Sequence, residues 1–149
     1  MLTCTKIYSD IPFAHRAHLH DGHCRFIHGH NWAFEIVFAA ERTDPCGFIV
    51  DFGKLKTLKQ ELDLFFDHSL ILNQADPLAE EIVAMFRLRN IHNVHFLPDC
   101  SCEGIARFVF DMADTFVREE SSGRAWCQQV TVHEDLKNYA TYGTASQGH

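Results

Sequence analysis

The sequence has little glycine or proline, no long hydrophobic run and no block of basic residues. It has 149 residues with 8 Gly and 4 Pro, and 46% of them are hydrophobic and 22% charged. This composition excludes a collagen-like, low-complexity or disordered chain. The most hydrophobic stretch, residues 32–40, is too short to cross a membrane and contains Glu35. A chain of this length can bury one core, so we expect one domain over residues 1–143 and a disordered tail over residues 144–149.

The charge and the cysteines restrict the class of protein further. A net charge of -7 without a basic cluster argues against nucleic-acid binding and against an anionic membrane surface. Residues 1–10 lack the hydrophobic region of a secretory signal, so we expect a cytoplasmic protein. In that reducing compartment the six cysteines are expected to remain thiols, and at least one of them is free for chemistry.

Histidine, in contrast, is abundant. The chain has 11, and six of them lie within residues 15–30. Such clustering points to a metal. The pattern His28-Gly29-His30 places two imidazoles on one strand face, and a third from the preceding strand would complete a three-nitrogen site with an open fourth position. That arrangement is typical of catalytic zinc, and we select His15 as the third ligand. Geometry alone leaves three alternatives to it: His18, His20 and His23.

Hydrophobic periodicity predicts an α+β fold. Alternation predicts strands over residues 3–14, 28–40, 125–134 and 138–143, with Trp126, Val130 and Val132 on the buried face of the third. Apolar residues at intervals of three and four predict long helices from Asp51, as N-cap, to residue 66 and over residues 101–120. A short helix over residues 77–86 and an extended piece over residues 94–96 lie between them. The order indicates helices on one face of a mostly antiparallel sheet.

Five segments in a fixed order resemble the 6-pyruvoyl-tetrahydropterin synthase / 6-carboxy-tetrahydropterin synthase family. Residues 24–31 (CRFIHGHN), preceded by residues 14–16 (AHR), resemble its zinc and nucleophile motif. The other segments that resemble the family are residues 47–56 (GFIVDFGKLK), 66–70 (FDHSL), 101–106 (SCEGIA) and 130–134 (VTVHE). The chain departs from the family at Cys100, where a Pro is expected, and in a long insert over residues 73–99.

The resemblance implies a tunnelling fold, in which a four-stranded antiparallel sheet carries two long helices. It further implies homotrimers or homohexamers whose barrels place active sites between subunits. The substrate would be a small pterin triphosphate, 7,8-dihydroneopterin triphosphate. Zn²⁺ on the three histidines would bind the hydroxyls of its side chain and acidify the adjacent carbon-bound proton.

The resemblance also implies a role for each remaining residue of the candidate site. Cys24 would be the base, Asp67 and His68 a proton relay, and Glu134 the group that accepts two hydrogen bonds from the pterin. Glu103 would be a further pterin contact. Each has a simpler alternative: a loop thiol for Cys24, a helix end for the Asp67-His68 pair and for Glu103, and a surface ion pair for Glu134. The other five cysteines are expected to be buried filler.

Three residues separate Cys24 from His28, a spacing that resembles the 6-carboxytetrahydropterin synthases of queuosine biosynthesis. The expected function is a lyase that releases acetaldehyde and triphosphate from the substrate. One alternative is a homologue with the same pocket that forms 6-pyruvoyl-tetrahydropterin or 6-hydroxymethylpterin. Another, from a different class, is a non-catalytic metal-binding protein whose ion is closed off by a fourth protein ligand such as Cys24.

Overall fold

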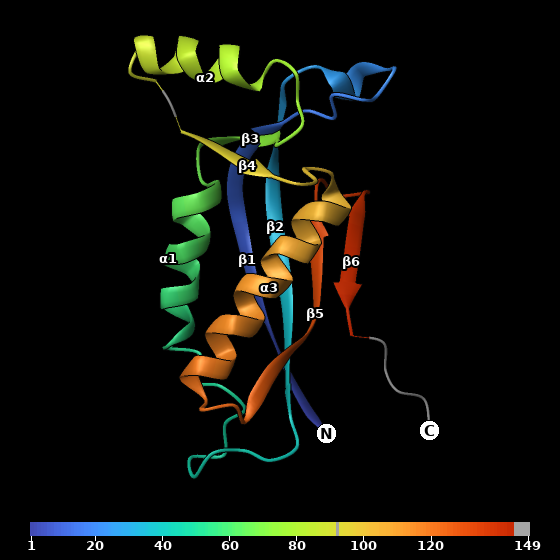
Figure 1. The fold of residues 1–149 in the computed structure, drawn as a ribbon. Helices are drawn as coiled ribbons and strands as arrows, with labels where there is room; N and C mark the ends of the chain where they lie inside the picture. Colours follow the sequence, from blue (N-terminus) through green and yellow to red (C-terminus); the bar gives the residue numbers. More distant parts are fainter. Residues whose placement is uncertain (92, 145–149) are drawn as a thin grey trace.

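The computed structural model describes residues 1–91 and 93–144, which contain six strands and three α-helices (Figure 1). In chain order the elements are β1 (Leu2–His15), β2 (His28–Ala40), α1 (Leu55–Phe66), β3 (Ser69–Asn73), α2 (Ala79–Leu88), β4 (Val94–Leu97), α3 (Cys102–Glu120), β5 (Ala125–His133) and β6 (Tyr139–Gly143), with a 3-10 turn at His23–Arg25. The α+β class is confirmed, and the four predicted strands correspond to β1, β2, β5 and β6.

The sheet is larger than the sequence predicted. Its strand order is β4-β3-β1-β2-β5-β6. The pairs β1–β2, β2–β5 and β5–β6 are antiparallel, whereas β3 runs parallel to both β1 and β4. The prediction of four antiparallel strands is therefore wrong: the sheet is mixed and has six. Strand β3 was missed because four of its five residues are buried, so it has no alternation.

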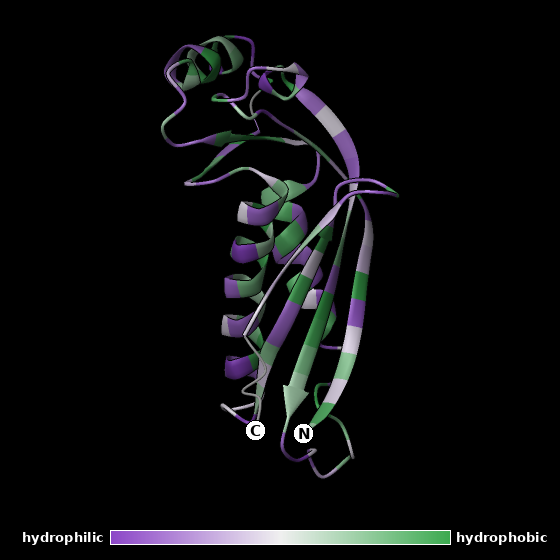
Figure 2. Ribbon diagram, turned by 90° about the vertical axis from the view of Figure 1, so that its right-hand side faces the viewer, coloured by the Kyte–Doolittle hydropathy of each residue, from purple (hydrophilic) through white to green (hydrophobic). Residues whose placement is uncertain are grey.

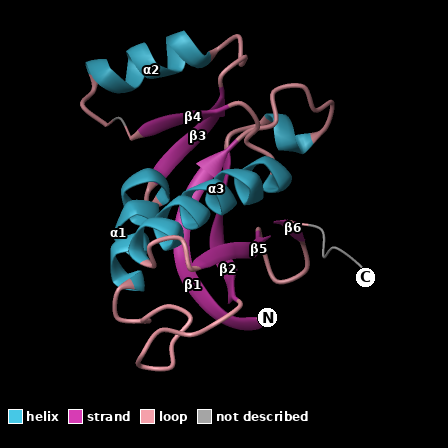
Figure 3. Ribbon diagram, turned by 60° about the horizontal axis from the view of Figure 1, so that its bottom comes forward, coloured by secondary structure: helices cyan, strands magenta, loops and turns pink. Residues whose placement is uncertain are grey.

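Helices α1 and α3 pack on one face of the long strands, as predicted for the two long helices (Figures 1 and 3). Their apolar stripes form one core with the alternating residues of β2, and Figure 2 shows both helices on the same side of the sheet. Helix α1 begins at Leu55 and not at Asp51. The Asp51 carboxylate instead accepts a hydrogen bond from the amide of Gly53 (2.8 Å), within the turn that precedes the helix.

Helix α2 lies against the opposite face of the sheet from the other two. The side chains of Leu70 and Leu72 pack with Ala79 of α2, whereas Ile71 between them joins the main core. Not all helices therefore cover one face, because within residues 73–99 β4 extends the sheet beside β3 while α2 packs over the end of the sheet (Figure 1). The short helix and the extended piece were predicted within two residues of their positions.

A bulge in β1 decides which way its last residues point. Tyr8 pairs with Phe34 and Ile11 with Trp32, so β1 has one extra residue, and Asp10 in the bulge has a φ of 58°. Even-numbered Tyr8 is buried before the bulge and odd-numbered Phe13 after it, so the buried face changes from even to odd positions at the bulge. The extra residue rotates the second half of the strand so that His15 faces the core side.

A second bulge, in β5, corrects the predicted buried face. Gln129 pairs with Val37 and Cys127 with Phe38, so Gln128 is an extra residue. Val130 is buried as predicted, but Trp126 is only half-buried and Cys127 takes the inward position. The alternation changes parity at the bulge, which the sequence does not reveal.

Among the described residues, no helix is long and apolar enough to cross a membrane. The predicted tail, residues 144–149, lies outside the described residues except for Thr144. The amide of Thr144 donates to the carbonyl of Gln128 (3.1 Å) and so continues the edge of the β5–β6 pair.

Candidate metal centre and active site

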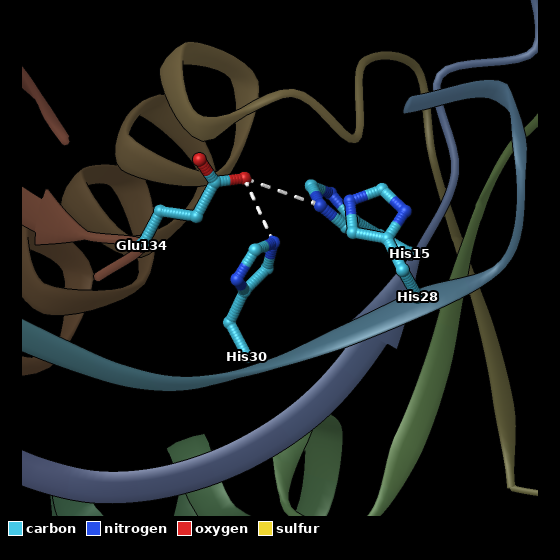
Figure 4. Close-up of side chains that lie close together, drawn as sticks. All are labelled: His15, His28, His30 and Glu134. Carbon is cyan, nitrogen blue, oxygen red and sulfur yellow. Dashed lines mark ion pairs between the residues drawn. The ribbon is translucent and has the colours of Figure 1, made fainter. Parts of the chain in front are cut away.

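Three histidines and one glutamate converge at the end of the sheet (Figure 4). His15 and His28 are directly opposite each other in the β1–β2 pair, and His30 lies two residues further along β2. Glu134 directly follows β5, the strand on the other side of β2. One potential ligand atom from each of the four lies within 4.8 Å of the others. His18, His20 and His23 are outside this group.

Backbone carbonyls orient two of the imidazoles. His15 Nδ1 bonds to the carbonyl of Cys100 (2.8 Å), and His28 Nδ1 to that of Phe26 (2.7 Å). A nitrogen that donates to a carbonyl carries the proton, so Nε2 of each ring keeps its lone pair for a cation. Burial lowers the pKa of His15, with a smaller contribution from neighbouring imidazoles, so this ring is neutral and able to ligate.

Two further observations fit a metal ion at this group. The Nε2 atoms of His15 and His30 are buried and have no hydrogen-bond partner among the described residues. Glu134 Oε1 is 3.3 Å from each of them, without hydrogen-bond geometry. Buried nitrogens of this kind are costly unless something binds them, and imidazole with carboxylate is a donor set that zinc accepts.

We call His15, His28, His30 and Glu134 the metal group. This group borders a cavity of about 460 Å³. Cys24, in the turn His23–Arg25, borders this cavity and is an exposed free thiol. The residues that line the cavity are His15, Ala17, His20, Cys24, His28, Ser101, Cys102, Glu103, Glu134, Lys137, Asn138 and Tyr139. The Cys24 thiol and the candidate metal site thus border the same cavity. This arrangement suits removal of a proton from a carbon next to an oxygen that a metal would bind.

The N-terminus of α3 forms another wall of the cavity. Ser101 caps the helix by accepting a hydrogen bond from the amide of Gly104 (3.1 Å), and Glu103 lies in the first turn. A side chain at position 104 would place its Cβ 2.3 Å from the carbonyl oxygen of Asp99. Glycine at this position therefore allows the segment that carries the Cys100 carbonyl to lie close to the helix.

Comparison with known families agrees with this geometry. A family model described as 6-pyruvoyl tetrahydropterin synthase matches residues 4–145. The chain belongs to this family. A 6-carboxy-5,6,7,8-tetrahydropterin synthase of Rickettsia typhi is 44% identical over 77 residues, which are 51% of this chain and 55% of that protein. In this alignment the chain spans about half the length of its curated relative.

Several solved structures share the fold of this chain. An uncharacterized protein of Wolinella succinogenes matches with a TM-score of 0.82 and 16% identity, over 95% of this chain and 97% of that one. The 6-pyruvoyl tetrahydropterin synthase of Caenorhabditis elegans matches with a TM-score of 0.63 and 24% identity, over 97% and 96% of the two chains. At these identities the likeness shows the fold alone.

One pair of predicted site residues lies away from the cavity of this family member. Asp67 and His68 follow α1, and His68 Nδ1 bonds to Asp67 Oδ1 (2.8 Å). The side chain of His68 is 80% exposed and that of Asp67 41%. Neither borders the cavity of its own chain. The pair is formed as expected, but it faces outward.

The expectation that the other five cysteines are buried filler is confirmed for Cys100 and Cys127 and is wrong for Cys46, which is exposed. Cys4 and Cys102 are only half-buried, and Cys102 borders the cavity. All six are free thiols. Burial, followed by the charge of Glu134, raises the pKa of Cys102 to about 11, so this thiol stays protonated beside the cavity.

Sequence reasoning also missed part of the cavity wall. Lys137 and Asn138, in the connection between β5 and β6, and Tyr139, the first residue of β6, also line the cavity. Their place in the sequence could have indicated them. They directly follow Glu134, and the turn after this residue must lie at the same end of the sheet as the histidines. Arg16 and Asp76, which join two loops near the site, had no signal in the periodicity.

Proposed function

We propose that this chain is a zinc-dependent lyase that converts 7,8-dihydroneopterin triphosphate and one water to 6-carboxy-5,6,7,8-tetrahydropterin with release of acetaldehyde and triphosphate. The observation that carries the proposal is that three imidazoles converge on one point while Cys24 borders the same cavity. The three-residue spacing between Cys24 and His28 and the name of the Rickettsia relative favour this product over 6-pyruvoyl-tetrahydropterin. The place of the reaction in queuosine biosynthesis, in the cytoplasm, is part of the same proposal.

His15, His28 and His30 would hold the zinc. Once bound, the ion supplies Lewis acidity to the side-chain hydroxyls of the substrate and makes the adjacent carbon-bound proton easier to remove. Cys24 takes that proton as a thiolate, a form that a nearby cation favours. The carbonyls of Cys100 and Phe26 hold two of the rings in the tautomer that this arrangement requires.

The carboxylates of the cavity would bind the pterin. Glu134 is 24% exposed and borders the cavity, so it can accept hydrogen bonds from the amino group and a ring N–H of the substrate. Glu103, at the N-terminus of α3, lies on the same wall and is the second candidate contact. A cavity of this volume is of the size that small-molecule sites commonly have.

Asp67 and His68 would act in the site of a neighbouring subunit. Their exposure leaves them free to reach a second chain, and their hydrogen bond leaves His68 Nε2 for proton transfer. This assignment requires a homotrimer or homohexamer, the assembly that the family resemblance implies.

The test is to incubate the purified zinc-loaded protein with 7,8-dihydroneopterin triphosphate and to identify the products. We expect 6-carboxytetrahydropterin and acetaldehyde in equal amounts. Turnover without acetaldehyde would overturn the proposal, and the pterin then recovered, 6-pyruvoyl-tetrahydropterin or 6-hydroxymethylpterin, would assign the alternative reaction.

A second candidate function, metal binding without turnover, is favoured by one observation. Glu134 is a fourth donor within 4.8 Å of the histidines and could close the metal site. Glu134→Gln separates the two functions, because it removes the charge and keeps the shape. For the lyase we expect one zinc per chain and a KM about tenfold or more above that of the wild type. Glu35→Gln, which alters the contact of Glu35 with His133, the residue before Glu134, is the matched control, because it makes the same change outside the group that could hold the metal.

Loss of zinc from Glu134→Gln, together with no turnover by the wild type, would support the metal-binding function. In that case Cys24→Ala and Glu103→Gln should leave zinc binding unchanged, because neither residue belongs to the metal group.

A further inference from the structure

Arg16, the residue directly after His15, forms a buried two-pronged ion pair. Its Nε is 2.5 Å from Asp76 Oδ2 and its Nη2 is 3.1 Å from Asp76 Oδ1. The Asp76 side chain is fully buried, and that of Arg16 is 15% exposed. A pair of this geometry fixes the plane of the guanidinium, which a single contact would not do.

The same guanidinium also reaches the turn that carries Cys24. Its Nη1 donates to the carbonyl of Arg25 (3.2 Å). The next amide, that of Ala17, donates to the carbonyl of Cys24 itself (2.8 Å). Arg16 and Ala17, the two residues after His15, thus bind the carbonyls of Arg25 and Cys24 in the turn that carries the thiol.

Asp76 is anchored from the other side by the segment that precedes α2. Its Oδ1 accepts the amide of Leu78 (3.0 Å), and its carbonyl accepts the amide of Ala79 (3.1 Å). Burial alone would raise the pKa of Asp76, but the hydrogen bonds from Arg16 and Leu78 and the charge of Arg16 lower it overall. The carboxylate is therefore ionised, and the ion pair persists across the neutral pH range.

We propose that the Arg16–Asp76 pair positions the thiol of Cys24 against the histidine group, and that residues 73–79 serve to hold Arg16 in place. Arg16 is a positioning residue, because it acts through the backbone of the turn at residues 23–25. The inference rests on the proposed role of Cys24 as the base. The geometry of a base relative to the proton that it removes strongly affects the rate, so a shift of this turn lowers kcat.

The first test is Arg16→Lys, which keeps the positive charge but cannot donate to Asp76 and to the Arg25 carbonyl in one plane. We expect kcat to fall about 10- to 100-fold with KM within about twofold and one zinc per chain. Arg118→Lys is the matched control, because it makes the same change in an ion pair with Asp114 in the last turns of α3. The control should keep the wild-type kcat.

The second test removes both charges, so that no buried charge is left without a partner. In the double variant Arg16→Gln/Asp76→Asn the position 76 side chain can still accept the amide of Leu78. We expect its melting temperature to stay near that of the wild type, while the amides of residues 16–27 exchange with deuterium about fivefold faster or more. Wild-type exchange in this segment together with wild-type kcat would overturn the proposal.

The exchange measurement separates this proposal from the proposed function. If the wild type fails to turn over the pterin, the proposed function fails, yet faster exchange confined to residues 16–27 would still show that the pair holds the turn. If the wild type is active and neither variant changes kcat, the proposed function stands and the positioning role is wrong.

Discussion

At the residue scale, the orientation of the candidate site comes from backbone carbonyls. Those of Cys100 and Phe26 set the rings of His15 and His28, so the side chains at positions 26 and 100 are not what matters for this contact. What matters is where the backbone lies. Gly104 permits the chain at Asp99 to approach the first turn of α3, and this approach places the Cys100 carbonyl next to β1.

Gly104→Ala should therefore damage the site at a distance. The added Cβ would lie 2.3 Å from the Asp99 oxygen and must displace the backbone. We expect a loss of about 1–3 kcal/mol in the free energy of unfolding and roughly tenfold weaker zinc binding through the displaced carbonyl. Urea denaturation and zinc titration measure the two effects. Gly29→Ala is the control, since its Cβ would meet the Phe13 oxygen at an ordinary 3.5 Å.

Cys24→Ala tests the proposed base directly. The turnover rate should fall about 10²- to 10⁴-fold, the usual contribution of a positioned acid or base. The zinc content should stay at that of the wild type, because the thiol is outside the metal group. Cys46→Ala, which removes the other exposed thiol, should keep full activity. A Cys24→Ala protein with wild-type turnover would exclude this residue as the base.

At the scale of the elements, the bulge in β1 is the feature on which the site depends. Strict alternation from the buried Tyr8 would turn position 15 toward the opposite face of the sheet. The extra residue at Asp10 reverses that parity, so His15 meets His28 across the strand pair on the core side. Asp10 has a φ of 58°, a conformation that β-branched residues strongly disfavour.

Asp10→Val should therefore weaken both the fold and the metal site. The strain of a left-handed backbone predicts a loss of about 1–2 kcal/mol in unfolding free energy, and relaxation of the bulge would turn His15 away and reduce the zinc bound per chain. Asp10→Gly keeps the backbone conformation and loses only an exposed hydrogen bond from Asn31, so it should bind zinc as the wild type does. Equal zinc affinity in the two variants would contradict this role of the bulge.

At the scale of the whole molecule, one chain holds a metal group and a thiol but leaves the Asp67–His68 pair facing solvent. A relay that lies outside its own cavity can serve catalysis only in another subunit. Strand β6 and the first half of β1 each have one side without a neighbouring strand among the described residues, and these sides could pair between chains.

Mixing inactive variants tests the shared site. Cys24→Ala and His68→Ala should each be inactive as pure oligomers, because every site lacks one group. When the two are unfolded and refolded together, some interfaces combine an intact Cys24 with an intact His68, and part of the activity should return. Mass spectrometry shows whether the refolded oligomers contain both variants. If such mixed oligomers recover no activity, Cys24 and His68 do not act together across an interface between subunits.

The local periodicity of the sequence determined the two long helices, the strands β1, β2, β5 and β6, and the shared face of His28 and His30. Such patterns are visible without the fold because they depend on residues two to four positions apart. On geometry alone the sequence left His15 open against His18, His20 and His23, and the tertiary structure decided that His15 joins the pair, through a bulge, and that Glu134 stands beside the histidines. It also decided that Asp76 holds Arg16 from 60 residues away. These contacts join segments that are distant in the chain, and register and long-range hydrogen bonds leave no periodic trace in the sequence.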